Sequence, residues 1–256
     1  MKTIDLNADI GEANTPEWAA SEAAIVSAIS SANIACGGHA GDAASMRLTV
    51  RNAKAAGVTI GAHPAYPDRA NFGRKSLVLG QDIDAKALAD NLRAQILDLV
   101  EICTSEDVTL AYVKPHGALY NDSVFDARKA DLVASVIAEL NLDLAFLGGP
   151  NSQMGRAASD HHLRFVAEGF IDRRYTDDGH LLSRKIDGAV IKEQSDRLNQ
   201  ARSLATTGVV KTQSGKTLTL KTGSLCVHGD SAGAVETAKQ ARAAIEAEGL
   251  TIKAFA

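Results

Sequence analysis

Residues 31–63, SANIACGGHAGDAASMRLTVRNAKAAGVTIGAH, contain the pattern that decides the fold. A short apolar run at 33–36 is followed by a glycine-rich loop, an Ala-rich segment of helical period and a second apolar run at 58–62. A histidine stands shortly after each apolar run, His39 after the first and His63 after the second. The stretch predicts a strand, a helix and a second strand, with polar chemistry in the loop after each strand.

The same alternation repeats from end to end and is typical of successive βα units. The expected strands are 3–7, 33–36, 58–62, 109–114, 144–148, 163–167 and 224–228. The expected helices are 17–30, 43–56, 84–104, 125–140, 151–159, 192–206 and 232–248. Thr15 with Pro16 should begin the first helix, because a threonine N-cap followed by proline suits the unpaired N–H groups there. Gly57 and Gly249 should end helices, because these ends favour residues that tolerate positive φ.

The segment 209–220, VVKTQSGKTLTL, departs from this rhythm. Apolar and polar residues alternate around Ser214 and Gly215, which predicts a β-hairpin. Its Gly-Lys-Thr is not a phosphate-binding P-loop, because that motif needs a glycine where Val210 stands.

Seven βα units could form an open, doubly wound sheet or a closed barrel. No G-x-G-x-x-G follows the first strand, so the dinucleotide-binding open sheet loses its main support. The sequence has no linker and no shift in composition, which favours a single domain over residues 1–256. We therefore expect an α/β barrel of seven or eight units, in which reactive residues gather at the C-terminal ends of the strands.

Composition narrows the function classes. The net charge of -4 gives no electrostatic reason to bind nucleic acid or anionic lipid, which leaves a small molecule or a protein as partner. The three cysteines are odd in number and widely spaced, as expected in a reducing compartment. No signal-peptide pattern begins the chain and no apolar run approaches about 18 residues, so we expect a cytoplasmic protein without a membrane span.

Four of the seven histidines lie within a few residues of the C-terminal end of a predicted strand: His39, His63, His116 and His228. Any one of them could be an ordinary surface or hydrogen-bonded histidine. A barrel would bring all four loops to one face, so the group is better explained as part of an active site.

Other polar residues accompany these histidines. Asp5, Asn7 and Asp9 share one face of an extended chain, with Glu12 beyond them. The carboxylates could bind a divalent ion or divide acid and base roles, or they could merely close the strand in an Asx-turn. Later loops add Tyr66, Asp68, Arg74, Lys114, Tyr120, Asn121, Asp172, Arg173, Arg184 and Asp230. The arginines suit a carboxylate or phosphate, which makes an anionic substrate or a nucleotide plausible.

Seven blocks, in order along the chain, carry a resemblance to a known family: DLNADIGE, SANIACGGHAGD, GAHPAYPD, NFGR, KPHGALYN, DRRYTDDGHLLSR and CVHGD. They resemble the LamB/YcsF family, whose characterised members are A subunits of the ATP-dependent 5-oxoprolinase. The resemblance implies a distorted seven-stranded, TIM-like β/α barrel of the glycoside hydrolase/deacetylase type. It also implies ring opening of 5-oxo-L-proline to L-glutamate, with ATP and its magnesium as co-substrate and subunits B and C as partners.

The resemblance further suggests roles for the candidate residues. Asp9, His39, His63 and His116 would surround the lactam, and Asp5, His228 and Asp230 would orient them. Lys114 and Arg173 would hold a carboxylate or phosphate. The other binding candidates are Asn7, Glu12, Tyr66, Asp68, Arg74, Tyr120, Asn121, Asp172 and Arg184. By analogy with related deacetylases, a divalent metal would take Asp9, His39 and His63 as ligands.

Two other functions stay open at this point. The chain could be a metal-dependent amide or carbohydrate deacetylase that acts alone without ATP. It could instead be a non-catalytic subunit that presents substrate to its partners. The sequence does not decide whether a metal is bound, which subunit phosphorylates the lactam, or whether the chain forms homo-oligomers.

Overall fold

The computed structural model describes residues 2–228 and 233–256, so Asp230 lies outside the described residues. Within them, seven parallel strands close into a barrel, in which the last strand pairs back with the first. The barrel strands are β1 (Thr3–Ile10), β2 (Ser31–Ala35), β3 (Thr59–His63), β4 (Leu110–Val113), β5 (Ala145–Gly148), β6 (Phe165–Phe170) and β9 (Ser224–Val227). The predicted seven-stranded α/β barrel is confirmed.

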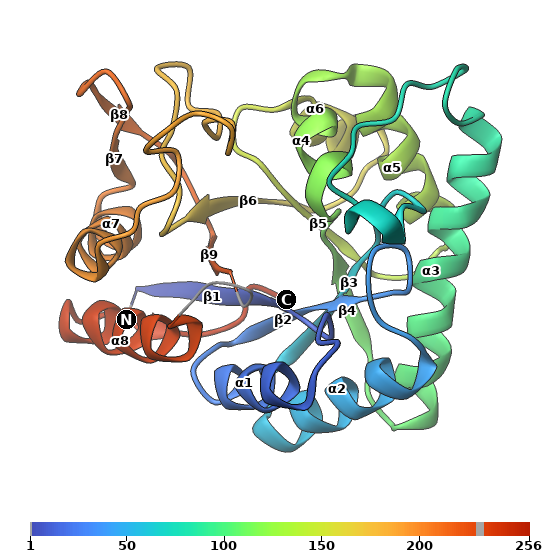
Figure 1. Cartoon of the computed structure of the whole chain (residues 1–256), viewed down its shortest axis with the longest axis horizontal. Helices are drawn as coiled ribbons and strands as arrows, with labels where there is room; N and C mark the ends of the chain where they lie inside the picture. The colour runs from blue at the N-terminus through green and yellow to red at the C-terminus, as the bar shows by residue number, and fades with distance from the viewer. Residues whose placement is uncertain (1, 229–232) are drawn as a thin grey trace.

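Helices cover the outside of the barrel (Figure 1). They are α1 (Pro16–Val26), α2 (Ala43–Ala56), α3 (Ala85–Ser105), α4 (Gly117–Phe125), α5 (Ala127–Glu139), α6 (Gln153–Asp160), α7 (Gln194–Thr206) and α8 (Ala234–Ala247), with the short 3-10 helix η1 (Arg69–Asn71). The expected hairpin is present as β7 (Val209–Lys211) and β8 (Thr217–Thr219). None of the helices described here is long and apolar enough to cross a membrane.

The helix ends follow the local signals in the sequence. The Thr15 side chain accepts a hydrogen bond from the Trp18 N–H, and Pro16 is the first residue of α1. Asp42 and Ser45 form a reciprocal capping box at the start of α2. Gly57 ends α2 with φ at +66°, a conformation that costs glycine little. The capped starts of α1 and α2 fix where the preceding βα loops end.

Several element boundaries differ from the expectations. The loop expected after β4 contains a helix, α4, which buries Ala118, Leu119 and Tyr120 against its neighbours. β1 continues to Ile10, because it pairs with β2 beyond the expected end, and β6 continues to Phe170 beside β9. β10 (Thr251–Ile252) pairs with the start of β1 and was not predicted, because two residues carry no periodic signal.

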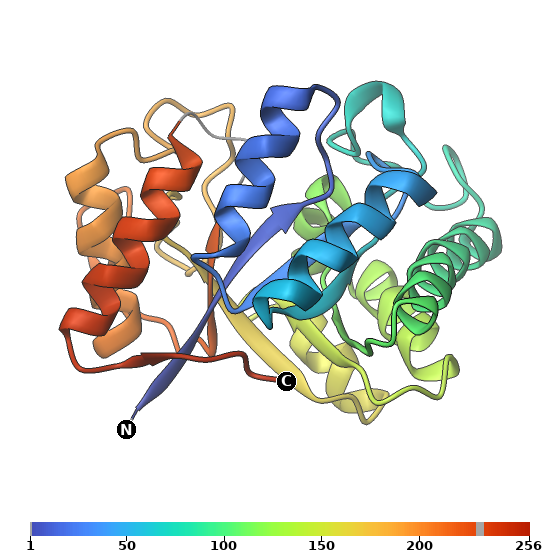
Figure 2. The ribbon, with the colours of Figure 1, turned by 90° about the horizontal axis from the view of Figure 1, so that it is seen from below.

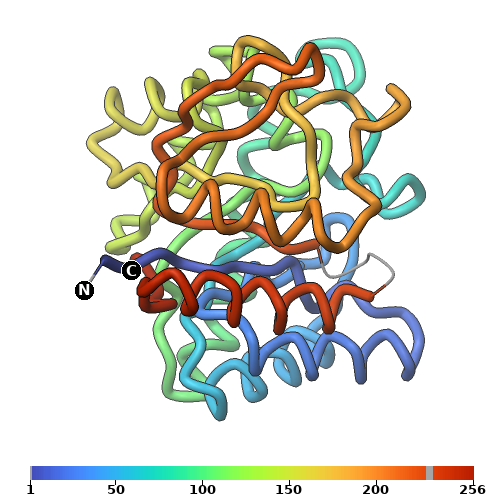
Figure 3. The backbone as a smooth tube through the Cα atoms, turned by 90° about the vertical axis from the view of Figure 1, so that its left-hand side faces the viewer, coloured from blue at the N-terminus to red at the C-terminus, as the bar shows by residue number. Residues whose placement is uncertain are grey.

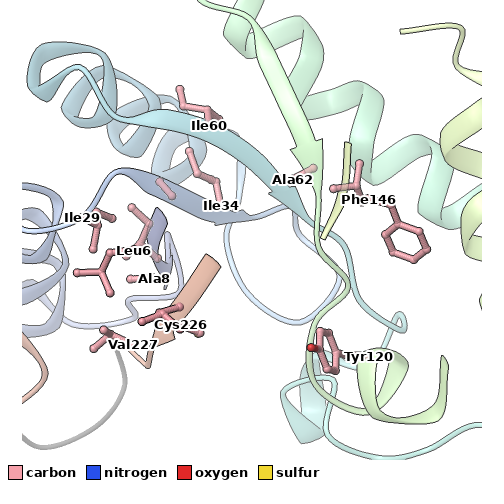
Figure 4. Close-up of a cluster of buried hydrophobic side chains, with 14 of the residues drawn as sticks. Leu6, Ala8, Ile29, Ile34, Ile60, Ala62, Tyr120, Phe146, Cys226 and Val227 are labelled. Carbon is pink, nitrogen blue, oxygen red and sulfur yellow. The ribbon is translucent and has the colours of Figure 1, made fainter. Parts of the chain in front are cut away.

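The barrel strands divide their side chains between two environments. On β1, Leu6 and Ala8 point outward and are fully buried beneath the helices, in the apolar cluster that also contains Ile29 and Ile34 (Figure 4). The alternate residues of β1 point into the barrel and are polar, because successive side chains of a strand face opposite sides. The main apolar core therefore lies between barrel and helices, whereas the barrel interior beside β1 is polar. A second, smaller apolar cluster contains Tyr112, Ala145, Leu147 and Val166.

The C-terminal part of the chain completes the barrel. Helices α7 and α8 pack side by side on one flank, and the β7–β8 hairpin extends from α7 (Figure 3). Both termini lie on the same side of the molecule, near the pairing of β10 with β1 (Figure 2). Because all the barrel strands are parallel, the loops that follow them meet at one end, as in other β/α barrels.

Candidate active site

Asp9 lies at the centre of the polar interior. Its carboxylate accepts hydrogen bonds from Asn33 Nδ2 at 2.7 Å and from Lys114 Nζ at 3.0 Å. Its other oxygen lies 3.4 Å from His63 Nε2. Burial alone would raise the pKa of Asp9, but Lys114 and His63 hold it well below its ordinary value. Lys114 is 2.8 Å from Glu168 as well, so a buried ammonium joins two carboxylates.

Beneath Asp9, a second polar layer supports it from inside the barrel. Ser31 and Ser224 donate hydrogen bonds to Asp5, whose pKa is raised by burial to about 6. Asn7 donates to Ser224 at 2.7 Å and to Glu168 at 2.9 Å. Asp5 and Asn7 therefore act on the site through other side chains.

Tyr112, on β4, is another buried residue that supports this layer. Its hydroxyl donates to Asn33 Oδ1 at 2.6 Å, which fixes the amide whose Nδ2 binds Asp9. The ring occupies the space where a side chain at position 61 would lie, since a Cβ on Gly61 would stand 2.2 Å from it. A glycine on β3 is therefore needed for this contact.

Three of the candidate histidines pack together at the end of the barrel. The rings of His39 and His116 are stacked with centroids 3.6 Å apart, and His63 meets both edge-on at 5.6 and 4.9 Å. Burial lowers the pKa of His39 to about 2, and burial with the nearby His63 lowers the pKa of His116 well below its ordinary value. His39 and His116 are thus held as neutral imidazoles.

Backbone carbonyls determine which nitrogens carry the protons. His63 Nδ1 lies 2.7 Å from the Lys114 carbonyl, and His116 Nε2 lies 3.0 Å from the Phe72 carbonyl, so these nitrogens donate. His63 Nε2 and His116 Nδ1 then face each other across 3.0 Å. The Glu12 carboxylate is 3.4 Å from the same His116 nitrogen. Two ring nitrogens and a carboxylate oxygen that lie this close together suit a cation between them.

Ligand atoms of Asp9, His63 and His116 lie within 4.8 Å of one another, and so do those of Glu12, His39 and His116. Among the described residues, no such group contains Asp9, His39 and His63 together. His39 instead directs Nε2 at Glu12, 2.9 Å away. In the ligand set that the sequence suggested, His116 therefore takes the place of His39.

A second acid–base pair adjoins Asp9, since ligand atoms of His228, Asp9 and Cys226 lie within 4.8 Å of one another. His228 directs Nδ1 at the Asp172 carboxylate, 2.8 and 2.9 Å from its two oxygens, and the ring stacks on Phe170 with centroids 5.5 Å apart. Burial would raise the pKa of Asp172, but the facing His228 outweighs it and the pKa is lowered. The pairing orients the imidazole so that its Nε2 is the nitrogen left for a ligand.

Arg173 contributes a buried cation. Only 5 % of the residue is exposed, and its Nη2 donates to the Leu182 carbonyl at 2.6 Å. In the part of the chain that the structure describes, its Nε has no hydrogen-bond partner. Burial, together with repulsion from Arg184, lowers its pKa to about 10. An anion is the natural partner for this guanidinium.

These groups surround one cavity of about 900 Å³. The sequence-derived candidates on its wall are Asp9, Glu12, His63, Arg74, Lys114, His116, Tyr120, Asn121, Arg173, Arg184 and His228. Four candidates lie behind that wall: Asp5, Asn7, His39 and Asp172. The structure thus brings most of the candidates together.

Tyr66 and Asp68 do not reach this cavity. The Tyr66 hydroxyl donates to Asp122 at 2.8 Å, and Asp68 accepts from Asn71 at 2.8 Å within the loop after β3. Both therefore stabilise loops that carry other site residues.

Two acidic residues that support the site had not been selected from the sequence. Glu168 was expected outside a strand, although a glutamate inside the apolar run FVAEGF was a signal. Glu22, on α1, accepts hydrogen bonds from the backbone N–H groups of Gly11 at 3.0 Å and Glu12 at 2.9 Å. Burial raises the pKa of Glu22 to about 7. Its position on a helix gave no sign that it holds the loop of Glu12.

Comparisons with known proteins agree on one family. The LamB/YcsF family model matches residues 4–256. The 5-oxoprolinase A subunit of Paracidovorax citrulli is 42 % identical over 99 % of both chains, and that of Kocuria rhizophila is 41 % identical over 100 % of both. The crystal structure of the lactam utilization protein from Thermus thermophilus is 32 % identical, superposes with a TM-score of 0.90 and covers 100 % of both chains.

Proposed function

Because the chain belongs to the LamB/YcsF family, we propose that it acts as the A subunit of a 5-oxoprolinase and carries the site that opens 5-oxo-L-proline to L-glutamate. The proposal includes ATP as co-substrate and subunits B and C as partners. A reaction that consumes ATP belongs in the cytoplasm, where we expect the chain. One observation carries the chemistry: the Asp9–His63–His116 group and the His228–Asp172 pair face one cavity.

Hydrolysis of a cyclic amide needs a base for the attacking water and an acid for the departing nitrogen. Asp9 supplies the base: Lys114 holds its pKa low, which keeps the carboxylate ionised at neutral pH but also makes it a weak base. His228 supplies the acid: with Nδ1 fixed on Asp172, its Nε2 gives a proton to the ring nitrogen as the C–N bond breaks. The two roles fall to neighbouring side chains, one on β1 and one directly after β9.

The residues also fit a divalent metal ion. Asp9, His63 and His116 would hold it, because their ligand atoms lie within 4.8 Å of one another and ring nitrogens of the two histidines face each other across 3.0 Å. Such an ion would polarise the amide carbonyl and lower the pKa of a bound water. The carbonyls of Lys114 and Phe72 keep both imidazoles in the tautomers that this requires.

Arg173 is better placed than Lys114 to bind the substrate carboxylate. Lys114 already contacts Asp9, Glu168, Asn7 and the sulfur of Cys226, so its donors are in use. Arg173 retains a buried Nε that meets no acceptor among the described residues. We propose that Arg173 anchors the carboxylate while Lys114 holds Asp9.

ATP would make the ring opening favourable. A lactam is stabilised by resonance, so phosphorylation of its oxygen makes the carbon a better target for water. The Gly-Lys-Thr of the chain belongs to the β7–β8 hairpin, which supports a phosphoryl transfer that depends on the partner subunits.

The test is 5-oxoproline-dependent formation of glutamate and ADP by the purified chain, alone and with subunits B and C. We expect turnover only with the partners, and a fall of at least about 100-fold for Asp9→Asn. Asp131→Asn is the matched control, because Asp131 is exposed and pairs with His161 away from the cavity. Full turnover after joint replacement of His39, His63 and His116 would contradict a catalytic role and favour a substrate-presenting subunit.

A stand-alone deacetylase is the second candidate, because the same carboxylate and two imidazoles could serve that reaction. The experiment separates the two: release of acetate from acetylated sugars or amides by the chain alone, without ATP, would replace the leading proposal.

A further inference from the structure

A small side pocket adjoins the main cavity, and the two spaces share Tyr120, Phe125 and Phe170 in their walls. Tyr120, labelled in Figure 4, belongs to α4, and the side pocket is further lined by Glu168 of β6 and His180 of the loop after it. The volume of the side pocket is about 20 Å³. A single water molecule needs roughly 10–15 Å³ of such space, so the pocket has room for one water and not for a substrate.

Three residues of this wall carry a buried polar atom that has no hydrogen-bond partner among the described residues: Tyr120 Oη, Glu168 Oε2 and His180 Nδ1. Tyr120 is only 5 % exposed and Glu168 is fully buried, so neither side chain reaches bulk solvent. The Tyr120 hydroxyl lies beside Gly149, another residue of the wall, where an added Cβ would stand 3.5 Å from it. Because buried polar atoms are nearly always hydrogen-bonded, three of them on one small wall indicate a polar ligand between them.

The Glu168 carboxylate belongs to the buried network that holds Asp9. Its Oε1 lies 2.8 Å from Lys114 Nζ and accepts a hydrogen bond from Asn7 Nδ2 at 2.9 Å, and the same Lys114 donates to Asp9 at 3.0 Å. A buried ion pair repays the cost of its burial only when hydrogen bonds satisfy the remaining lone pairs as well. A donor to Glu168 Oε2 in the side pocket would complete this network.

His180 belongs to the loop that holds Arg173. The His180 ring packs edge-on against Phe125 with centroids 4.6 Å apart, and two hydrogen bonds with Thr176 fix its backbone. Two residues further on, the carbonyl of Leu182 accepts the hydrogen bond from Arg173 Nη2. A ligand on His180 Nδ1 therefore acts on the same loop that positions the Arg173 guanidinium.

We propose that the side pocket binds one water molecule, which joins Tyr120, Glu168 and His180. The water ties the loop of Leu182 to the buried network of Asp9. It donates to Glu168 Oε2 and accepts from the Tyr120 hydroxyl, and its remaining proton or lone pair suits His180 Nδ1 in either tautomer. Three hydrogen bonds are typical of a buried water. The water site does not depend on which reaction the main cavity carries out.

A double-mutant cycle in urea unfolding tests the shared water, because no hydrogen bond or ring contact joins Tyr120 to His180 among the described residues. We expect Tyr120→Phe and His180→Phe each to raise the equilibrium constant for unfolding by about three- to tenfold. Since either change releases the same water, the double variant should fall short of the product of the two effects by at least about threefold. Tyr66→Phe is the control: its hydroxyl donates to Asp122 at 2.8 Å outside the pocket, so its effect should multiply in full with that of His180→Phe.

Unchanged or increased stability of Tyr120→Phe would overturn the water site, because the loss of a buried hydroxyl without a partner costs nothing. Effects of Tyr120→Phe and His180→Phe that multiply in full would overturn it as well. A high-resolution crystal structure of the native chain decides the matter even if a variant does not fold. We expect one peak of electron density within about 3.2 Å of all three polar atoms, and a pocket without this peak would contradict the proposal.

Discussion

Replacement of Glu22 by glutamine should separate stability from activity. The Glu22 carboxylate holds the backbone N–H groups of Gly11 and Glu12, and so fixes the loop from which Glu12 reaches His39 and His116. Glutamine has one oxygen in place of two, so one of these buried N–H groups loses its acceptor. A displacement near 1 Å at the reacting groups costs roughly 100-fold in rate, and we expect kcat/KM to fall by about 10- to 100-fold.

As the pH rises, the stability of the same variant should increase relative to that of the native chain, whereas its activity stays low. Burial raises the pKa of Glu22 from 4.5 to about 7, so the folded state favours the protonated form. The stability that this group contributes is present below pH 4.5 and is lost as the pH rises through 7. A shift of this size corresponds to roughly 3 kcal/mol. Glutamine does not ionise, so the variant does not lose this stability at high pH. This difference offsets the destabilisation of roughly 1–3 kcal/mol that we expect from the missing hydrogen bond.

Urea unfolding of both proteins at pH 5 and pH 8 measures this difference. We expect the variant to gain about 2–3 kcal/mol relative to the native chain between the two pH values. Glu106→Gln is the control: its hydrogen bonds with Arg51 and Arg47 lower the pKa of Glu106 to about 2, so its effect should not change across this interval. An equal loss of stability for Glu22→Gln at both pH values, or full activity of the complex, would refute the reasoning.

Three further outcomes are expected. Asp172→Asn should lower kcat by about 100-fold or more with little change in KM, because His228 loses the carboxylate that orients it. A larger effect on KM would point to a role of Asp172 in substrate binding instead. Lys114→Met should destabilise the fold by roughly 3–5 kcal/mol in urea unfolding, because Asp9 and Glu168 keep their buried charge without the cation. An unchanged free energy of unfolding would argue against the buried ion pair. Removal of metal with a chelator should lower both activity and Tm, and zinc or manganese should restore them; retention of both would exclude a bound ion.

Much of the fold could be predicted because the relevant signals are local. The apolar runs, the helical periods, the Thr15–Pro16 start of α1 and the turn at Gly57 depend on neighbours within a few residues, and the structure agrees with them. Element ends were less predictable. Asp9 lies inside β1, and α4 begins directly after His116, because pairing and packing with distant segments extend or start these elements.

The sequence by itself determined the barrel and the face on which its histidines gather, because periodicity and parallel strands place every βα loop at one end. Only the tertiary structure decided how these residues are paired. It placed His116 rather than His39 beside Asp9 and His63. It also paired Lys114 with Glu168 and placed Glu22 where its carboxylate binds the backbone of Glu12. These partners lie on different strands and helices, and the protons of the imidazoles are fixed by carbonyls from yet other segments. Such contacts depend on side-chain positions in the closed barrel, which have no counterpart in local sequence.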